Sequence, residues 1–322
     1  MTIIAFSKRR KFPMLPQQSE NGHPGTAIDI RQARRLFASP EFVAESGFLR
    51  REISGRMRER LQLIKVAPGK ILDAGCGEGA DLLMLQADFT QAFVLGLDAS
   101  FGMLGQARQK RTANASQLRK FLPAWLPLPT AALPPAGLAC GDFASLPLAP
   151  NTVDLLWSNL ALHWHPQPDR VIAEWRRVIK TDGLLMFSAL GPDTFKELRD
   201  AFAMHDNYPH VLPFVDMHDF GDMLVHAGFS TPVMDMETIT VTYPTVERML
   251  SDVRAMGGLP LGSRRKSLTG RQRWKRMIGS IDEMRRPDGL LALTIEVVYG
   301  HAFLPVPKKT ASGESIIRFE RR

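Results

Sequence analysis

Five apolar runs of strand length are spread through the middle of the chain. The first begins at Lys70, and the others lie at 92–98, 137–142, 152–158 and 183–189. Helices are expected between them at 80–86, 99–110 and 168–180, the last with apolar residues at the 3.6-residue period. Strands that alternate with helices favour a parallel, doubly wound sheet, so the expected fold class is α/β.

The flanking sequences predict further helices and two strands. Residues 27–66 carry apolar side chains at roughly helical spacing with arginines between them, and Ser39-Pro40 divides them into two helices. After residue 190, helices are expected at 193–205, 219–227, 245–256 and 271–285, and strands at 238–243 and 290–303. We interpret 27–66 as an N-terminal helical lid, 67–190 as a core, and 191–304 as the C-terminal part of the fold with a substrate cap.

Three stretches are expected to lie outside the regular elements. Residues 1–26 contain Lys8-Arg9-Arg10-Lys11 with no apolar segment after it, which argues against a secretory signal and predicts a disordered leader. Residues 305–322 are expected to be a frayed tail. The proline-rich stretch 112–136 is too long for an ordinary connection between a strand and a helix, so we interpret it as an insertion.

A glycine-rich turn follows the first strand, in Asp73-Ala74-Gly75-Cys76-Gly77-Glu78-Gly79. Glycines at alternate positions let the backbone turn tightly and approach a ligand without side-chain clashes. The free amides at the start of the next helix would face that ligand. The turn therefore predicts a binding site at the end of this strand.

Polar side chains also follow the neighbouring strands. Ligands of open α/β sheets bind outside the carboxyl ends of the strands. Asp98 lies about twenty residues beyond the glycines, where an acid can bind both hydroxyls of a ribose. Asp142 with Phe143 can bind an adenine amino group beside a flat ring, and Asn159 follows the fourth strand. Together these residues predict a nucleoside cofactor.

The glycine spacing narrows the kind of cofactor. It differs from the GxGxxG of dinucleotide sites, and GxxxxGK[ST] is absent. The turn 73–79, with Asp98, Asp142 and the turn 180–183, resembles class I S-adenosylmethionine-dependent methyltransferases. The resemblance covers about 70–190. It implies a Rossmann-like, mostly parallel sheet and S-adenosylmethionine as cofactor, bound by Asp73, Gly75, Gly77, Gly79, Asp98, Asp142, Phe143 and Asn159.

A narrower resemblance extends to about residue 303. Residues 146–149, 154–164, 188–199 and 210–216 are similar to the BioC family of methyltransferases. Members of that family methylate the free carboxyl of a malonyl group on acyl carrier protein. The ester masks the charge, so that the chain can be elongated towards the pimeloyl part of biotin. The resemblance implies this O-methyltransferase activity and malonyl-loaded acyl carrier protein as the partner.

Other functions stay open on the sequence alone. Residues 48–53 with Arg56 are similar to complex I assembly factors, a sister family associated with arginine hydroxylation, and the first tyrosine is Tyr208, whereas many BioC members carry a Tyr-Asp pair in the lid. An RNA or small-molecule methyltransferase and a non-catalytic binding module are further alternatives.

Carboxyl methylation needs few catalytic groups, because a carboxylate is already a nucleophile at neutral pH. The enzyme must align it and exclude water. Arg199 is the candidate for holding the carboxylate, with a solvated helix arginine as the alternative. His163 and Trp164 follow the fourth strand and are candidates for shaping the acyl pocket, with a packed pair that caps the sheet as the alternative.

Charge and cysteine content complete the expectations. The formal net charge is +8, and residues 264–276 carry seven basic residues without an acid. This run fits an acidic carrier protein, a solvated surface or nucleic acid, but Trp274 is the only aromatic residue within it, which disfavours nucleic acid. Cys76 and Cys140 lack metal-site spacing and indicate a reducing, cytoplasmic compartment. No apolar run is long enough to span a membrane.

Overall fold

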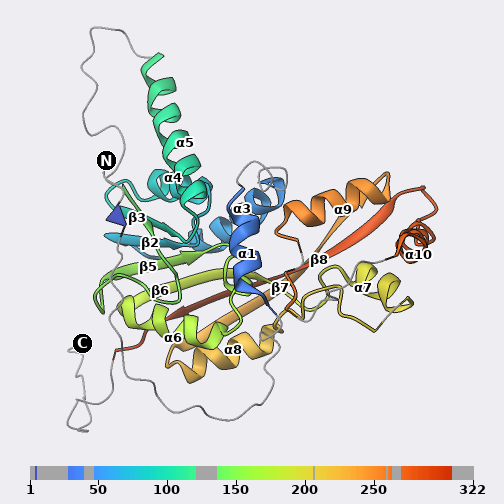
Figure 1. Ribbon diagram of the computed structural model, residues 1–322. Helices are drawn as coiled ribbons and strands as arrows, with labels where there is room; N and C mark the ends of the chain where they lie inside the picture. The colour runs from blue at the N-terminus through green and yellow to red at the C-terminus, as the bar shows by residue number, and fades with distance from the viewer. Residues whose placement is uncertain are drawn as a thin grey trace.

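A computed structural model describes residues 4–5, 28–39, 47–120, 136–205, 207–258, 260–262 and 270–306, with the backbone alone at 4–5 and 113–120. An eight-stranded sheet forms the middle layer, and helices cover both of its faces (Figure 1). The expected α/β class is confirmed. Among the described residues, no helix combines the length and the apolar character needed to cross a membrane.

The first part of the sheet is parallel. Its strands are β2 (Lys70–Ala74), β3 (Phe93–Asp98), β4 (Ala136–Cys140), β5 (Val153–Ser158) and β6 (Ile179–Leu190). They lie in the order β4-β3-β2-β5-β6, so the chain reverses its direction of travel across the sheet at β2. The carboxyl ends of these strands therefore meet at one edge, where the glycine-rich turn lies.

Two antiparallel strands extend the sheet beyond β6. β8 (Leu291–Phe303) pairs with β6, and β7 (Ser230–Tyr243) pairs with β8. Both strands expected in the C-terminal part are therefore present, and they belong to the same sheet. β7 begins eight residues before the predicted Thr238. The prediction started too late because the first half of the strand has few β-branched residues and contains Pro232. Its long pairing with β8 supplies the hydrogen bonds that local propensity does not predict.

A two-residue strand, β1 (Ile4–Ala5), joins the opposite edge of the sheet in parallel with β4. Ile4 and Ala5 thus form a strand within the segment predicted to be a disordered leader. The rest of that leader and residues 307–322 of the predicted tail lie outside the described residues.

The helices bury their apolar faces in two separate cores. Leu155 and Trp157 of β5 point to one face of the sheet, whereas Leu156 points to the other, as the alternation of a strand requires. α4 (Ala80–Asp88) and α5 (Phe101–Lys120) cover the first face. α6 (Pro168–Val178) and α8 (Met217–His226) cover the second, on the lower side of Figure 1.

The boundaries of α5 and of the α6–β6 junction also differ from the prediction. α5 continues to Lys120, so residues 112–120 of the predicted insertion are helical, and 121–135 lie outside the described residues. α6 ends at Val178, and β6 begins at Ile179 rather than at Gly183. The predicted turn at Asp182 survives as an irregularity within the strand, because Asp182 has a φ of 61° and the register against β5 shifts there.

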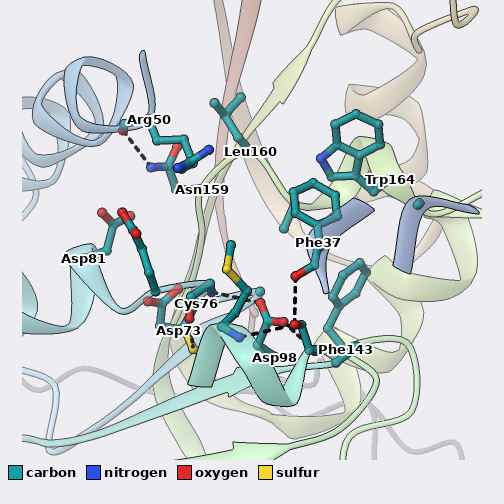
Figure 2. A pocket seen from close by; sticks show the side chains of 18 of the residues that line it. Phe37, Arg50, Asp73, Cys76, Asp81, Asp98, Phe143, Asn159, Leu160 and Trp164 are labelled. Atoms are coloured by element: carbon teal, nitrogen blue, oxygen red, sulfur yellow. Dashed lines mark hydrogen bonds between the residues drawn. The ribbon is translucent and has the colours of Figure 1, made fainter. Parts of the chain in front are cut away.

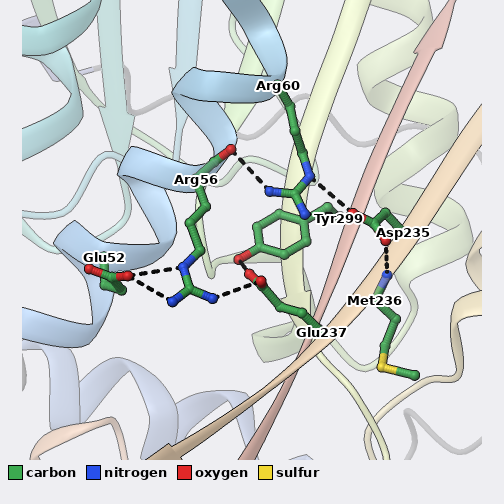
Figure 3. Close-up of polar contacts among 7 residues, drawn as sticks. All are labelled: Glu52, Arg56, Arg60, Asp235, Met236, Glu237 and Tyr299. Carbon is green, nitrogen blue, oxygen red and sulfur yellow. Dashed lines mark hydrogen bonds and ion pairs between the residues drawn. The ribbon is translucent and has the colours of Figure 1, made fainter.

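The predicted N-terminal helices are α1 (Ile30–Phe37) and α3 (Gly47–Gln62). Salt bridges hold α3 against the β7–β8 pair (Figure 3). Arg56 pairs with Glu237 at 2.7 Å, and Arg60 pairs with Asp235 at 2.5 Å and lies 4.0 Å from the centre of the Tyr299 ring. α7 (Lys196–Ala203), α9 (Val246–Ala255) and α10 (Arg271–Asp282) gather at the far end of these strands (Figure 1).

Candidate active site

A cavity opens at the carboxyl ends of β2 to β5, and α1 and α3 form its opposite wall (Figure 2). Seven of the eight predicted cofactor residues line it: Asp73, Gly75, Gly77, Asp98, Asp142, Phe143 and Asn159. The sequence therefore located the cavity wall that belongs to the sheet. The sequence predicted no site residue on α1 or α3, the helices of the opposite wall.

The glycine-rich turn packs so closely that its first glycine has no room for a side chain. Gly75 has a φ of 84°, and a Cβ placed on it would lie 2.4 Å from the Cβ of Ala161. The amides of Gly75 and Cys76 both donate to the carbonyl of Leu97, at 2.8 and 3.0 Å. These contacts bring the turn against the end of β3, so that a bound ligand can approach the backbone.

The third glycine of the turn serves helix packing. Gly79 caps α4 with a φ of 77°, and a Cβ placed on it would lie 2.8 Å from the Cβ of Ala107 in α5. It is the predicted cofactor residue that does not line the cavity. Its small size lets α4 and α5 approach each other.

Asp98 is fixed by two backbone amides. Its carboxylate accepts hydrogen bonds from the amide of Gly77 at 2.8 Å and from that of Ser100 at 2.7 Å, one on each oxygen. Burial raises the pKa of Asp98, and these two hydrogen bonds oppose the rise. Each oxygen keeps a further acceptor position, so the carboxylate can accept from two hydroxyl groups of a diol.

Asp142 and Phe143 form the other end of the cavity together with the N-terminal helix α1. Asp142 accepts from the amide of Ala144 at 2.9 Å and pairs with Arg34 of α1 at 2.7 Å. Phe37, also on α1, packs edge-on against Trp164, with 5.3 Å between the ring centres. Figure 2 shows Phe37 and Phe143 on the same side of the cavity as Asp98.

Asp73 carries a buried oxygen that lacks a partner. The side chain is 1% exposed, and its Oδ2 has no hydrogen-bond donor among the described residues. Burial raises the pKa of Asp73 well above its usual range, and the charges of Asp81 and Asp98 raise it further. A ligand that brings a cationic donor into the cavity would satisfy this oxygen and neutralise its charge.

A polar cluster around Arg50 lies at the end of the cavity opposite Phe143 (Figure 2). Asp81 accepts from the indole of Trp157 at 2.8 Å. Asn159 donates to the carbonyl of Arg50 at 3.1 Å and accepts from the hydroxyl of Ser188 at 2.8 Å, so its amide joins β5 to α3. Burial lowers the pKa of Arg50, whereas the charge of Glu78 raises it.

The three predicted catalytic residues lie in different places. Trp164 lines the cavity. His163 is buried beside it without lining the cavity; its ring packs against Phe214, and burial lowers its pKa to about 3, so it is neutral at physiological pH. Arg199 lies in a separate surface pocket with Tyr208 and His210, and its guanidinium donates to the carbonyl of Pro192.

Sequence reasoning missed the cavity residues of the N-terminal helices and Asp81. Arg34, Phe37, Arg50 and Arg51 all line the cavity, and each belongs to a helix whose arginines recur between apolar residues. That spacing predicts the helices, but it does not tell which arginine faces the sheet. Asp81 lies two residues beyond the glycine-rich turn, and its position in the first turn of α4 was the available signal.

Comparison with known proteins agrees with this geometry. A methyltransferase domain model matches residues 72–187. Malonyl-acyl carrier protein O-methyltransferase from Laribacter hongkongensis is 46% identical over 84% of this chain and 89% of its own length. The enzyme of the same name from Gallionella capsiferriformans is 42% identical over 90% of this chain and 96% of its own length. The chain belongs to the malonyl-acyl carrier protein O-methyltransferase family.

The fold of this family member also matches a solved structure. A putative methyltransferase from Bacillus halodurans superposes with a TM-score of 0.53 at 16% identity, covering 78% of this chain and 99% of its own. Without β1, the strand order β4-β3-β2-β5-β6-β8-β7 is that of class I methyltransferases. The predicted Rossmann-like methyltransferase fold is confirmed.

The methyl donor of the family is S-adenosylmethionine, and the cavity fits it. The Asp98 carboxylate suits the ribose hydroxyls, and Phe143 offers a flat ring at the adenine end. The unpartnered oxygen of Asp73 suits the ammonium group of the methionine part, and Arg50 suits its carboxylate. Among the described residues, no group of three or more His, Cys, Asp and Glu side chains is placed to hold a metal ion.

Proposed function

We propose that this protein transfers a methyl group to the free carboxyl of a malonyl thioester carried on acyl carrier protein, in the pimeloyl branch of biotin biosynthesis. The observation that carries the proposal is the 46% identity to a relative of that name over 84% of the chain. The complete cofactor cavity supports it, because the residues that suit S-adenosylmethionine lie on both the sheet and the helices.

The chemistry places modest demands on the protein. Bound S-adenosylmethionine supplies a methyl carbon that its sulfonium charge makes electrophilic. A malonyl carboxyl is ionised at neutral pH, so no side chain has to remove a proton from it. The protein's tasks are to align the carboxylate and to exclude water, as α1 and α3 do by forming the wall that faces the strand ends.

Two predicted residues fit into this scheme by their positions. Trp164 adds an apolar wall to the cavity, packed against Phe37, and can shape the acyl site. His163 is buried outside the cavity lining and packs against Trp164 with 4.7 Å between ring centres, so its role is to support that ring. Burial lowers its pKa to about 3, which makes it a weak base. Arg199 lies on a surface that a carrier protein could reach, outside the methyl-transfer cavity.

The exposed face of α10 is the proposed docking surface for the carrier. Arg271, Lys275 and Arg276 are exposed on it, beside Trp274, which is 40% exposed. Acyl carrier proteins are acidic, so opposite charge would guide docking. The basic residues at 264–266 lie outside the described residues. A cytoplasmic location belongs to the same proposal, since both cysteines are free thiols.

The test is incubation of the protein with S-adenosylmethionine and malonyl-acyl carrier protein, followed by mass measurement of the acyl group. A mass gain of one methyl group on the malonyl group is the expected result. If the cofactor binds but the acyl group stays unchanged, the activity is a different one, with arginine hydroxylation as the first candidate. If RNA binds with a steep salt dependence and the carrier does not bind at low salt, the acceptor is RNA.

A further inference from the structure

Two neighbouring arginines of α3 line the cavity in different surroundings. Arg50 is half-buried and lies in the field of Glu78 and Asp81. Arg51 lines the cavity too, but its side chain is exposed. Adjacent residues leave a helix about 100° apart, but both side chains reach back to the start of α3. Nη2 of Arg50 lies 3.7 Å from the place where a Cβ on Gly47 would be, and Nη1 of Arg51 lies beside the same place, so the two guanidinium groups are neighbours in one cavity.

The cationic side chains that line the cavity can be compared by their partners. Among the described residues they are Arg34, Arg50 and Arg51. Arg34 is paired with Asp142 at 2.7 Å. Arg51 makes no ion pair or side-chain hydrogen bond with a described residue. Of the three, Arg51 is therefore the one whose charge the protein leaves for an incoming anion.

The guanidinium of Arg51 lies close to a glycine one turn earlier. Its Nη1 lies 2.9 Å from the place where a Cβ on Gly47 would be. The guanidinium therefore reaches back over the start of α3, where Gly47 also lines the cavity. The salt bridges of Arg56 and Arg60 to β7 hold the same helix and fix its rotation about its own axis.

Two anions must be accommodated when both substrates are bound. One is the carboxylate of the methionine part, and the other is the carboxylate of the acyl group. We propose that Arg50 pairs with the first and that Arg51 holds the second, so that Arg51 is the residue that selects an acyl group with a free carboxyl. This assignment rests on the proposed function. It replaces Arg199 as the acceptor's cationic partner.

The reaction is balanced without a proton transfer. One oxygen of the acceptor carboxylate forms a bond to the methyl carbon, while the carbon–sulfur bond breaks and its electron pair stays on sulfur. A guanidinium that holds the other oxygen would orient the attack. The acyl group changes from an anion to a neutral ester, so the pair with Arg51 is lost in the product. Arg51 should thus bind the malonyl substrate more tightly than the malonyl methyl ester that the reaction produces.

The test compares Arg51→Gln and Arg51→Lys with Arg50→Gln, and uses Arg31→Gln as a control, because Arg31 is exposed on α1 and does not line the cavity. Arg51→Gln should raise the KM for malonyl-acyl carrier protein at least tenfold and leave the Kd for S-adenosylmethionine within about twofold, which also shows that the variant is folded. Arg51→Lys should fall between it and the wild type. Arg50→Gln should instead raise the Kd for S-adenosylmethionine.

A second readout separates recognition of the carboxyl from structural effects. Acetyl-acyl carrier protein has no free carboxyl, so its inhibition constant should be the same in the wild type and in Arg51→Gln. The proposal is overturned if Arg51→Gln keeps the wild-type KM, or if it weakens S-adenosylmethionine as much as Arg50→Gln does. An inactive wild type would overturn the proposed function itself, whereas an active wild type with an unaffected Arg51→Gln overturns this inference alone.

Discussion

Arg34 of α1 pairs with Asp142 at the end of β4, with 2.7 Å between Nη2 and Oδ2. The pair joins the N-terminal helix to the end of the cavity proposed for the adenine, although both side chains keep much of their exposure, 55% and 38%. An exposed ion pair of this kind contributes about 0–1 kcal/mol to the free energy of unfolding. Its effect should therefore be found in cofactor binding rather than in stability.

Replacement of Arg34 tests this separation. Arg34→Gln should weaken S-adenosylmethionine binding severalfold in calorimetry, because α1 no longer closes over Asp142, and should leave the melting temperature nearly unchanged. Arg35→Gln is the matched control, since Arg35 is exposed on the same helix without lining the cavity. Equal cofactor affinity in the two variants would show that the Arg34–Asp142 pair does not contribute to cofactor binding.

Gly75 should not tolerate a side chain. Gly75→Ala places a Cβ 2.4 Å from that of Ala161 and forces a left-handed backbone, which costs about 1–2 kcal/mol by itself. We expect loss of cofactor binding together with a lower melting temperature. Gly77→Ala isolates the backbone cost, because its Cβ would meet only Met103 at 3.7 Å. Adding Ala161→Gly to Gly75→Ala should restore part of the loss, and no recovery would place the strain elsewhere.

Asp73 should show opposite effects on stability and on binding. Its pKa is raised in the folded protein, mainly by burial, so the folded state holds a proton that the unfolded state releases above about pH 4. The stability that the protonated form contributes is present at low pH and is lost as the pH rises through the raised pKa. Asp73→Asn should therefore stabilise the ligand-free protein, more at pH 8 than at pH 5.

The same substitution should impair binding. The amide of Asn has no charge to offer the ammonium of S-adenosylmethionine, so the Kd should rise about tenfold or more, as for other charge-assisted hydrogen bonds. Thermal melts at the two pH values and calorimetry measure the two effects. A destabilised Asp73→Asn variant at pH 8 would mean that Asp73 is stabilised in its charged form by groups other than a ligand.

The docking surface proposed on α10 can be tested apart from the chemistry. Lys275→Glu combined with Arg276→Glu should raise the KM for malonyl-acyl carrier protein about tenfold, which corresponds to about 1.4 kcal/mol of docking free energy. Malonyl-pantetheine lacks the carrier protein, so its KM should not change. The S-adenosylmethionine Kd should also stay constant. If the KM for malonyl-acyl carrier protein changes neither with these substitutions nor with the salt concentration, α10 is excluded as the docking surface.

The sheet side of the site was predictable because topology fixes it. Strand ends, glycines and acids follow one another along the chain, and the parallel order brings Asp73, Asp98 and Asp142 to one edge. The rotation of α3 was not predictable, since packing against β6 and the Arg56 and Arg60 pairs sets it. The same holds for α1, which is placed by the Arg34–Asp142 pair and by Phe37 against Trp164. Arginines recur along both helices, and spacing alone did not single out Arg50 and Arg51.

The positions of the predicted catalytic residues could not be predicted from the sequence either. His163 and Trp164 are adjacent after β5, and nothing in their spacing predicts that their side chains point to different places. A single turn of 3-10 helix, η2 (Leu162–Trp164), directs Trp164 into the cavity wall and His163 into the core against Phe214. Arg199 was chosen for its charge, and α7 carries it to a separate pocket.

The central claim is methyl transfer to the malonyl carboxyl, and one measurement tests it most directly. The mass of the acyl group is followed in time with S-adenosylmethionine and malonyl-acyl carrier protein, beside acetyl-acyl carrier protein and an Asp98→Ala variant that has lost the carboxylate proposed for the ribose. The account predicts that the wild-type protein adds one methyl group to the malonyl group and none to the acetyl group. The Asp98→Ala variant should add none to either. An unchanged malonyl group on cofactor-loaded wild-type protein would contradict it.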